Sequence, residues 1–167
     1  MASIGSTGGA MAYNSLAALD MVGRLLREAL WAPAMIVLGA LVLAHLPRAP
    51  HWWWLLHIVG GAAVAFCYLR AIRIAAPRLG ALQPAGAYLL AFALSCSSAL
   101  GWEIGEFAVD QIAGTTLQQG NFDTMSDLIL GVAGAAVYLG VHAIRSSRTS
   151  WPELGKRQHQ ARDQAAR

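Results

Sequence analysis

Cationic side chains are missing from a long stretch of this sequence, because no lysine or arginine occurs between Arg78 and Arg145. The same stretch contains five carboxylates: Glu103, Glu106, Asp110, Asp123 and Asp127. They lie at the ends of two long apolar runs, where a carboxylate without a nearby cation is costly to desolvate. A neighbouring basic residue is therefore excluded as their partner. A proton, a metal ion, or a His or Arg from another helix must take its place.

Charge of either sign is scarce, at 13% of the residues, whereas 56% are hydrophobic and the mean hydropathy is +0.47. This composition excludes an ordinary water-soluble domain. Four apolar runs approach the roughly 20 helical residues that cross a bilayer, and they lie at 29–46, 52–69, 85–106 and 126–144. The runs lack the alternation of barrel strands. The sequence therefore predicts an all-α polytopic membrane protein with a four-transmembrane-helix bundle.

The positions of the basic residues predict the orientation of this bundle. All but one of the 12 lysines and arginines precede the first run or follow the second or the fourth, and the exception is Arg48. Because basic residues collect on the cytoplasmic side, we expect a bacterial inner-membrane protein with both termini in the cytoplasm. The high isoelectric point then reflects orientation and attraction to anionic lipid, and no nucleic-acid partner is expected.

The same pattern divides the chain into three parts. We expect a cytoplasmic or interfacial segment at 1–28, the transmembrane domain at 29–145 and a basic cytoplasmic tail at 146–167. The segment from Ser15 to Leu30 either forms an amphipathic helix on the inner surface or extends the first span.

Cysteines are few, and Cys67 and Cys96 both fall in the middle of spans. This placement favours packing as small apolar residues over a disulfide framework.

Small residues four positions apart occur in three of the runs. Such pairs let membrane helices approach closely, and we interpret them as packing positions. They are Gly61 with Ala65, Gly101 with Gly105, and Gly131 with Ala135.

Ionisable side chains converge on the predicted outer side. His57 lies about 9 Å into the second run at the helical rise. Glu103 and Glu106 share one helix face, and Asp123 and Asp127 share another if the last helix has begun by then. The predicted metal ligands are His57, Glu103, Glu106, Asp123 and Asp127.

Some of these residues also have simpler interpretations. Asp123 or Thr124 is well placed to cap the last helix, and Thr124 with Asp127 has the form of a capping box. Asp110 is expected to be a solvated charge on the loop side.

Oxygen ligands with a single imidazole suit Mg²⁺, Mn²⁺ or Ca²⁺ better than Zn²⁺. In a catalytic version of the site, Glu103, Glu106 and Asp127 would hold or assist a metal ion. That ion would activate water or polarise a phosphoryl group of a lipid or lipid-linked substrate. No motif supports a covalent nucleophile, because Ser95, Ser97 and Ser98 lack a base adjacent in sequence.

Several short strings resemble one family. They are Trp102-Glu-Ile-Gly-Glu-Phe107, Gln119-Gly-Asn-Phe-Asp-Thr124 and Asp127-Leu with Gly131 and Gly134-Ala135, preceded by His57 and Gly60-Gly61. Over roughly residues 50 to 140 they resemble the YjdF-like family of small bacterial inner-membrane proteins, which looks related to the wider VanZ-like group. The resemblance implies the topology and the location of the site. An acid often stands in that pattern where this chain has Asn121, which removes one candidate ligand.

Two non-catalytic functions also fit these residues. In one, the protein is an accessory subunit whose acidic layer pairs with basic residues of a larger membrane protein complex. In the other, the carboxylates form a proton or cation pathway. The second is weakened because the inner halves of the second and third runs contain no acid or histidine. Such a pathway would have to use the serines from Ser95 to Ser98, water, or His142.

Overall fold

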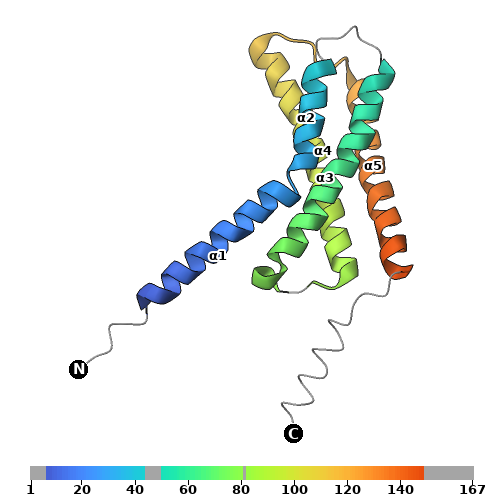
Figure 1. The fold of residues 1–167 in the computed structure, drawn as a ribbon. Helices are drawn as coiled ribbons and strands as arrows, with labels where there is room; N and C mark the ends of the chain where they lie inside the picture. The colour runs from blue at the N-terminus through green and yellow to red at the C-terminus, as the bar shows by residue number, and fades with distance from the viewer. Residues whose placement is uncertain (1–6, 44–49, 81, 149–167) are drawn as a thin grey trace, which may run out of the picture.

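The computed structural model describes residues 7–43, 50–80 and 82–148, and this part of the chain is almost entirely helical, without strands. Its helices are α1 (Thr7–Glu28), α2 (Trp31–Leu43), α3 (Pro50–Leu79), α4 (Pro84–Ala113) and α5 (Asn121–Arg148). Helices α2 to α5 form a bundle, and α1 leaves it at about mid-height and slants down and away from it (Figure 1). The predicted all-α class is thereby confirmed.

Among the described residues, three helices are long and apolar enough to cross a membrane: Trp52–Arg78, Pro84–Ala113 and Asn121–Ser146. A fourth span exists if α1 and α2, which meet at a bend of 46°, are taken as one broken span. Helix α2 alone has 13 residues, and its length of about 20 Å is short of a bilayer core of about 30 Å. The protein is thus a polytopic membrane protein, and the first span expected at 29–46 corresponds to α2, which reaches the length of a span only together with the end of α1.

The helix ends are set by local sequence. Pro84 occupies the first turn of α4, where its missing N–H is harmless. Gly114 ends that helix with φ of 65° and donates its backbone N–H to the carbonyl of Asp110, and Gly120, with φ of 114°, precedes α5. Glycine adopts positive φ without the steric penalty of other residues. These glycines place the short connection between α4 and α5 at the upper end of the bundle (Figure 1).

The tightest helix pair is α3 with α5. A methyl group built on Gly61 would overlap the backbone carbonyl of Gly131, and one on Gly134 would overlap the carbonyl of Ile58. The predicted role of Gly61 and Gly131 in close packing is confirmed. Below this crossing, the buried core consists of Ala65, Leu69, Ala91, Ala135 and Leu139.

The prediction that Gly101 and Gly105 are packing positions is wrong for contacts within the described part of the chain. Side chains added at either glycine would meet no atom within 4 Å. Both residues are exposed, because this face of α4 points away from the other described helices.

In the lower half of the bundle, charged side chains of α1 and α3 are in contact. The Arg70 guanidinium donates to the Glu28 carboxylate over 2.6 Å, and Arg24 pairs with the same carboxylate one helical turn earlier. This end carries the basic residues of α3, whereas the carboxylates of α4 and α5 lie at the other end. The structure thus separates the charges along the bundle as the sequence predicts, and which end faces the cytoplasm stays a prediction. Arg48 and residues 149–167, which include most of the basic tail, lie outside the described residues.

We expect single cysteines at the two ends of the bundle to report opposite sides of the membrane. In a background with Cys67→Ala and Cys96→Ala, Gln119→Cys should react with a membrane-impermeant maleimide in intact spheroplasts. Gln83→Cys, in the connection between α3 and α4, should react only after lysis, because basic residues favour the cytoplasmic side. The reverse pattern would place the carboxylate end in the cytoplasm and overturn the predicted orientation.

Candidate functional site

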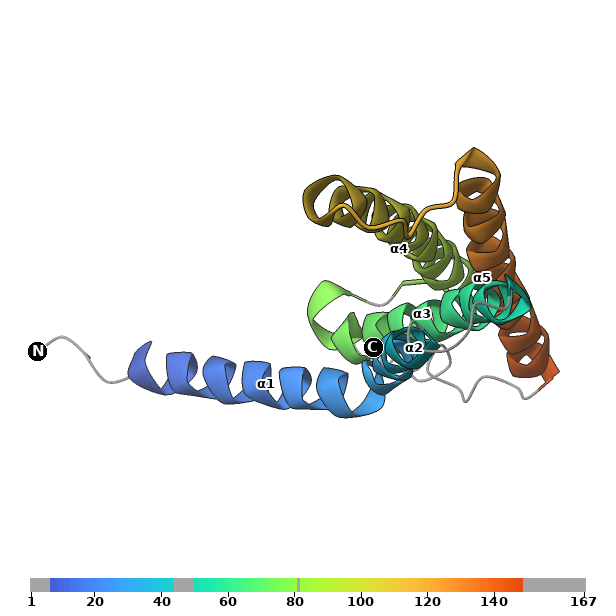
Figure 2. The ribbon, with the colours of Figure 1, turned by 90° about the horizontal axis from the view of Figure 1, so that it is seen from above.

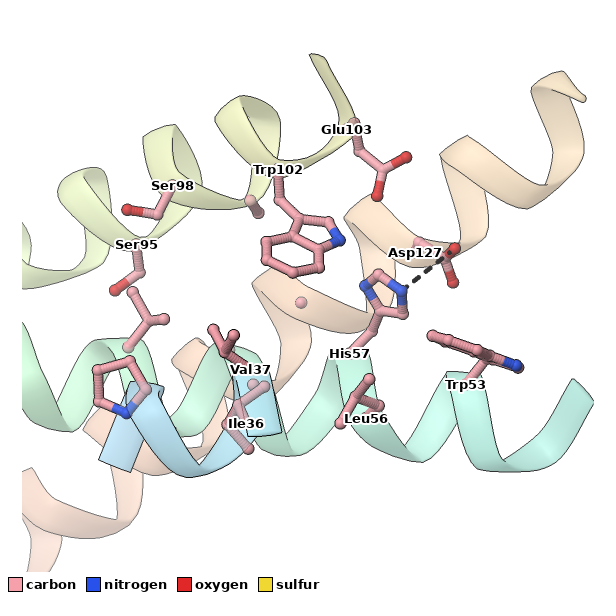
Figure 3. A pocket seen from close by; sticks show the side chains of 16 residues that line it. Ile36, Val37, Trp53, Leu56, His57, Ser95, Ser98, Trp102, Glu103 and Asp127 are labelled. Carbon is pink, nitrogen blue, oxygen red and sulfur yellow. Dashed lines mark ion pairs between the residues drawn. The ribbon is translucent and has the colours of Figure 1, made fainter. Parts of the chain in front are cut away.

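Three ionisable side chains from three helices meet at the upper end of the bundle. They are His57 on α3, Glu103 on α4 and Asp127 on α5 (Figure 3). One ligand atom from each lies within 4.8 Å of the other two, and His57 Nε2 is 3.3 Å from Asp127 Oδ2. Glu103 is only 4% exposed and Asp127 only 7%. We call these three residues the triad.

The close contact of α3 with α5 explains why two triad members face each other. His57 precedes Gly61 by four residues, and Asp127 precedes Gly131 by four. Each of the two ionisable side chains therefore lies on the same helix face as a glycine one turn away. Because the glycines bring the two backbones into contact, the next turn leaves room for one imidazole and one carboxylate. The predicted proximity of His57 to a carboxylate is confirmed for Asp127.

Glu103 is held by a residue that the sequence analysis did not include. The Gln118 side-chain amide donates to the Glu103 backbone carbonyl over 2.9 Å and to its Oε2 over 3.3 Å. Gln118 belongs to the connection between α4 and α5, which folds back over the end of α4. The string beginning at Gln119 was noted for its resemblance, but no sequence pattern shows that the preceding glutamine turns inward.

Asp110 shapes this connection. Its Oδ1 accepts the Leu117 backbone N–H over 2.8 Å and the Thr115 hydroxyl over 2.6 Å, and its Oδ2 accepts the Gln118 backbone N–H over 3.0 Å. Asp110 therefore acts as more than the solvated charge expected from sequence. Its carboxylate fixes the backbone from which Gln118 reaches Glu103.

Two predicted ligands lie outside the triad. The Trp102 indole N–H donates to Glu106 Oε1 over 2.8 Å. Asp123 Oδ2 accepts the Gln119 backbone N–H over 3.0 Å, in the first turn of α5. Asp123 thus supports the start of this helix, in line with its alternative interpretation as a cap. The proposed capping box is not formed, because α5 begins before Thr124 and Asp127 contacts His57.

The triad has more negative charge than its protein partners balance. Within the described ranges, neither Glu103 nor Asp127 forms an ion pair with a lysine or arginine. Asp127 Oδ1 is buried and has no hydrogen-bond partner. A buried acceptor without a partner costs about 1–3 kcal/mol. The geometry therefore leaves an acceptor that a proton, a hydrogen-bond donor or a cation would satisfy.

The spacing of the triad is compatible with a metal ion. Adjacent ligands of an octahedral ion with bonds of about 2.1 Å lie about 3.0 Å apart, and opposite ligands about 4.2 Å. The distance between His57 Nε2 and Asp127 Oδ2 is near the first value, and small side-chain rotations would bring Glu103 within the second. Two carboxylates and one neutral imidazole carry two negative charges, which a divalent cation would neutralise.

Fold and site together define a small polytopic helical membrane protein with a buried group of ionisable side chains at one end. The chain belongs to the family described as predicted membrane protein, DUF2238, whose profile matches residues 11–148. No curated protein and no solved structure matches the chain.

Proposed function

We propose that His57, Glu103 and Asp127 bind one divalent cation and that the protein uses it to act on a lipid or lipid-linked phosphoryl group. The observation that carries this proposal is the buried and unpartnered Oδ1 of Asp127, which belongs to a carboxylate that is grouped with ligand atoms from two other helices. A cation would satisfy this oxygen and neutralise both carboxylates, where no lysine or arginine of the described residues does so. We further propose the YjdF-like and VanZ-like relationship, which rests on the strings quoted above.

The ligand set suggests the metal. Five predicted ligands become three in this proposal, because Glu106 and Asp123 are engaged elsewhere. One nitrogen with two carboxylates is a weak match for Ca²⁺, which takes six to eight oxygens, and catalytic Zn²⁺ sites more often use two or three histidines. Manganese sites in helical bundles combine glutamate and histidine ligands, so Mn²⁺ is the better fit and Mg²⁺ the alternative. Water molecules would complete the coordination, and one of them is the candidate nucleophile.

The remaining side chains have supporting roles in this proposal. Gln118 orients Glu103, and such hydrogen-bonded partners tune ligands of metal sites. Glu106 lies one turn beyond Glu103 and is the candidate general base for a bound water. Its carboxylate accepts a hydrogen bond from the Trp102 indole, which limits its rotation.

The proposal is tested by the metal content of the purified full chain, compared between two glutamate variants of the same helix. We expect about one Mn²⁺ per chain after equilibration with Mn²⁺ and gel filtration. Glu103→Gln should lose it because the substitution removes one of the two negative charges that would hold the cation. Glu106→Gln should retain it. Elemental analysis measures both.

Equal loss in the two variants would contradict the three-residue ligand set. Metal-free wild-type protein that purifies with a fixed partner would instead support the accessory-subunit function. Metal-free protein without such a partner would leave protonation as the means by which the triad is neutralised, as a proton pathway requires.

A further inference from the structure

A cavity of about 200 Å³ begins at the triad and extends along the bundle. His57, Glu103 and Asp127 line one end of it, and the serines Ser95 and Ser98 line the other (Figure 3). Between these ends the lining is mainly apolar and includes Ile36, Val37, Leu56, Val64 and Ala99. The cavity thus has one charged end and a long apolar remainder, which is the polarity of a lipid.

The serine hydroxyls do not make the far end of the cavity polar. Ser95 Oγ donates to the Ala91 backbone carbonyl of its own helix over 2.7 Å, and Ser98 Oγ is hydrogen-bonded to the Tyr68 hydroxyl over 2.7 Å. Because both hydroxyls already have partners, this end has little need for water. Apolar cavities of about this size stay dry and bind apolar molecules. A continuous water chain is therefore disfavoured and a hydrocarbon occupant favoured.

The cavity is lined from one side by α2 and from the other by α4, two helices whose backbones stay apart. Seen from above, both of them flank α3 (Figure 2). In the described part of the chain each of them packs on α3, but no Cα atom of α2 lies within 8 Å of a Cα atom of α4. Val37 of α2 and Trp102 of α4 both line the cavity, and each is 43% exposed. The side of the bundle is consequently open at this level, where the surroundings of a membrane-spanning helix are lipid.

We propose that this cavity binds one hydrocarbon chain of a phosphate-bearing lipid, which enters between α2 and α4 and places its phosphate at the triad. The headgroup part rests on the proposed function. Glu103 and Asp127 would repel a phosphate unless a cation lay between them. The chain part depends only on the cavity. The site would thereby recognise two features of a lipid. The triad with its cation would bind the phosphate, and the apolar part of the cavity would hold one hydrocarbon chain.

Two serines of α4 provide a matched pair of variants. Ser95 lines the cavity and is 4% exposed, whereas Ser97 is exposed on the opposite face. Both hydroxyls donate to the carbonyl four residues earlier, so their local bonds are alike. Ser95→Leu therefore adds volume to the cavity, and Ser97→Leu adds the same volume to the lipid-facing surface. Val37→Phe, from α2, is a second filling variant if Ser95→Leu fails to fold.

The probe is hexadecyl phosphate with a photoreactive diazirine in mid-chain, added to the full chain in phosphatidylcholine nanodiscs with Mn²⁺. Labelling of peptides that line the cavity, measured by mass spectrometry, should fall about tenfold in Ser95→Leu, which corresponds to ~1.4 kcal/mol of lost binding. Ser97→Leu should label as the wild type does. The corresponding hexadecanol probe should label whether or not Mn²⁺ is present, whereas the phosphate probe should need Mn²⁺.

The metal content of the same samples separates the two proposals. Ser95→Leu should keep its Mn²⁺ while losing the label. Equal labelling of Ser95→Leu, Val37→Phe and Ser97→Leu would overturn the cavity proposal and leave the metal site intact. Wild-type protein without metal that still labels in a Ser95-dependent manner would overturn the metal site and support the chain-binding cavity. Labelling by the phosphate probe that is unchanged by chelation would overturn the assignment of the phosphate to the cation.

Discussion

Gly134→Ala should lower the stability of the bundle by about 1–3 kcal/mol, the usual cost of overpacking. The added methyl group would overlap the backbone carbonyl of Ile58, which belongs to a rigid helix and cannot turn aside as a side chain can. Helix α5 would have to move away from α3, and the contacts of Ala135 and Leu139 in the core would weaken with it. Thermal unfolding in detergent, followed by circular dichroism, measures the change.

Gly140 on the same helix is the matched control. A methyl group there meets nothing within 4 Å, so Gly140→Ala should be neutral or stabilising by up to about 1 kcal/mol, because alanine is the better helix former. Gly61→Ala should behave like Gly134→Ala, since its added methyl group would overlap the backbone carbonyl of Gly131 at the same helix crossing. Equal stability of Gly134→Ala and Gly140→Ala would contradict the close crossing of α3 and α5 and, with it, the placement of His57 beside Asp127.

Hydropathy predicted the three long spans because the bilayer imposes length and composition on each helix independently of its neighbours. The helices extend beyond the apolar runs, since polar ends such as Arg70 to Arg78 continue α3 into the interface. A break between α1 and α2 agrees with Pro33 in the first turn of α2, because proline cannot continue a preceding helix. The direction of the bend was not predictable, since Glu28 at the end of α1 contacts Arg70, which is distant in the sequence.

Small-residue spacing was a partial guide to packing. The same pattern marks a backbone contact at Gly61 and an exposed face at Gly101. Whether a glycine contacts another helix or is exposed depends on the rotation of its helix about its own axis. When a helix is apolar on all sides, its sequence does not predict that rotation.

Helix periodicity also explains how far the site could be predicted. A spacing of three residues turns a side chain by about 60° from the first, and one of four turns it by about 40° at about 6 Å along the axis. The prediction that residues three or four positions apart share a helix face was therefore only approximate. Glu106 is turned far enough to meet the Trp102 indole, and Asp123 lies a full turn above the triad. Gln118 and the apolar cavity depend on the loop and on the relative positions of helices, which no local pattern specifies.

Asp127→Asn should abolish metal binding while making the metal-free protein more stable. In the wild type, Mn²⁺ at a hundred times its dissociation constant should stabilise the fold by about 2.7 kcal/mol. For a chain of this size, each kcal/mol raises Tm by about 2–4 °C. The variant should show none of this metal-dependent rise. Its metal-free Tm should exceed that of the wild type, because the substitution removes a buried charge that no lysine or arginine of the described residues balances, while the amide oxygen can still accept a hydrogen bond from His57.

Asp123→Asn is the control, since it removes a charge one turn away on the same helix without touching the triad. It should retain the metal-dependent rise in Tm and lose a little stability through its weaker bond to the Gln119 backbone. The opposite signs of the two metal-free shifts separate a functional site from a structural one. If a carboxylate has a structural role, neutralising it should destabilise the protein. If a carboxylate serves to bind a cation, its charge should destabilise the metal-free protein, and neutralising it should raise the stability of that form. A loss of metal-free stability in Asp127→Asn, with no Mn²⁺ effect in the wild type, would make the contact of Asp127 with His57 a structural ion pair.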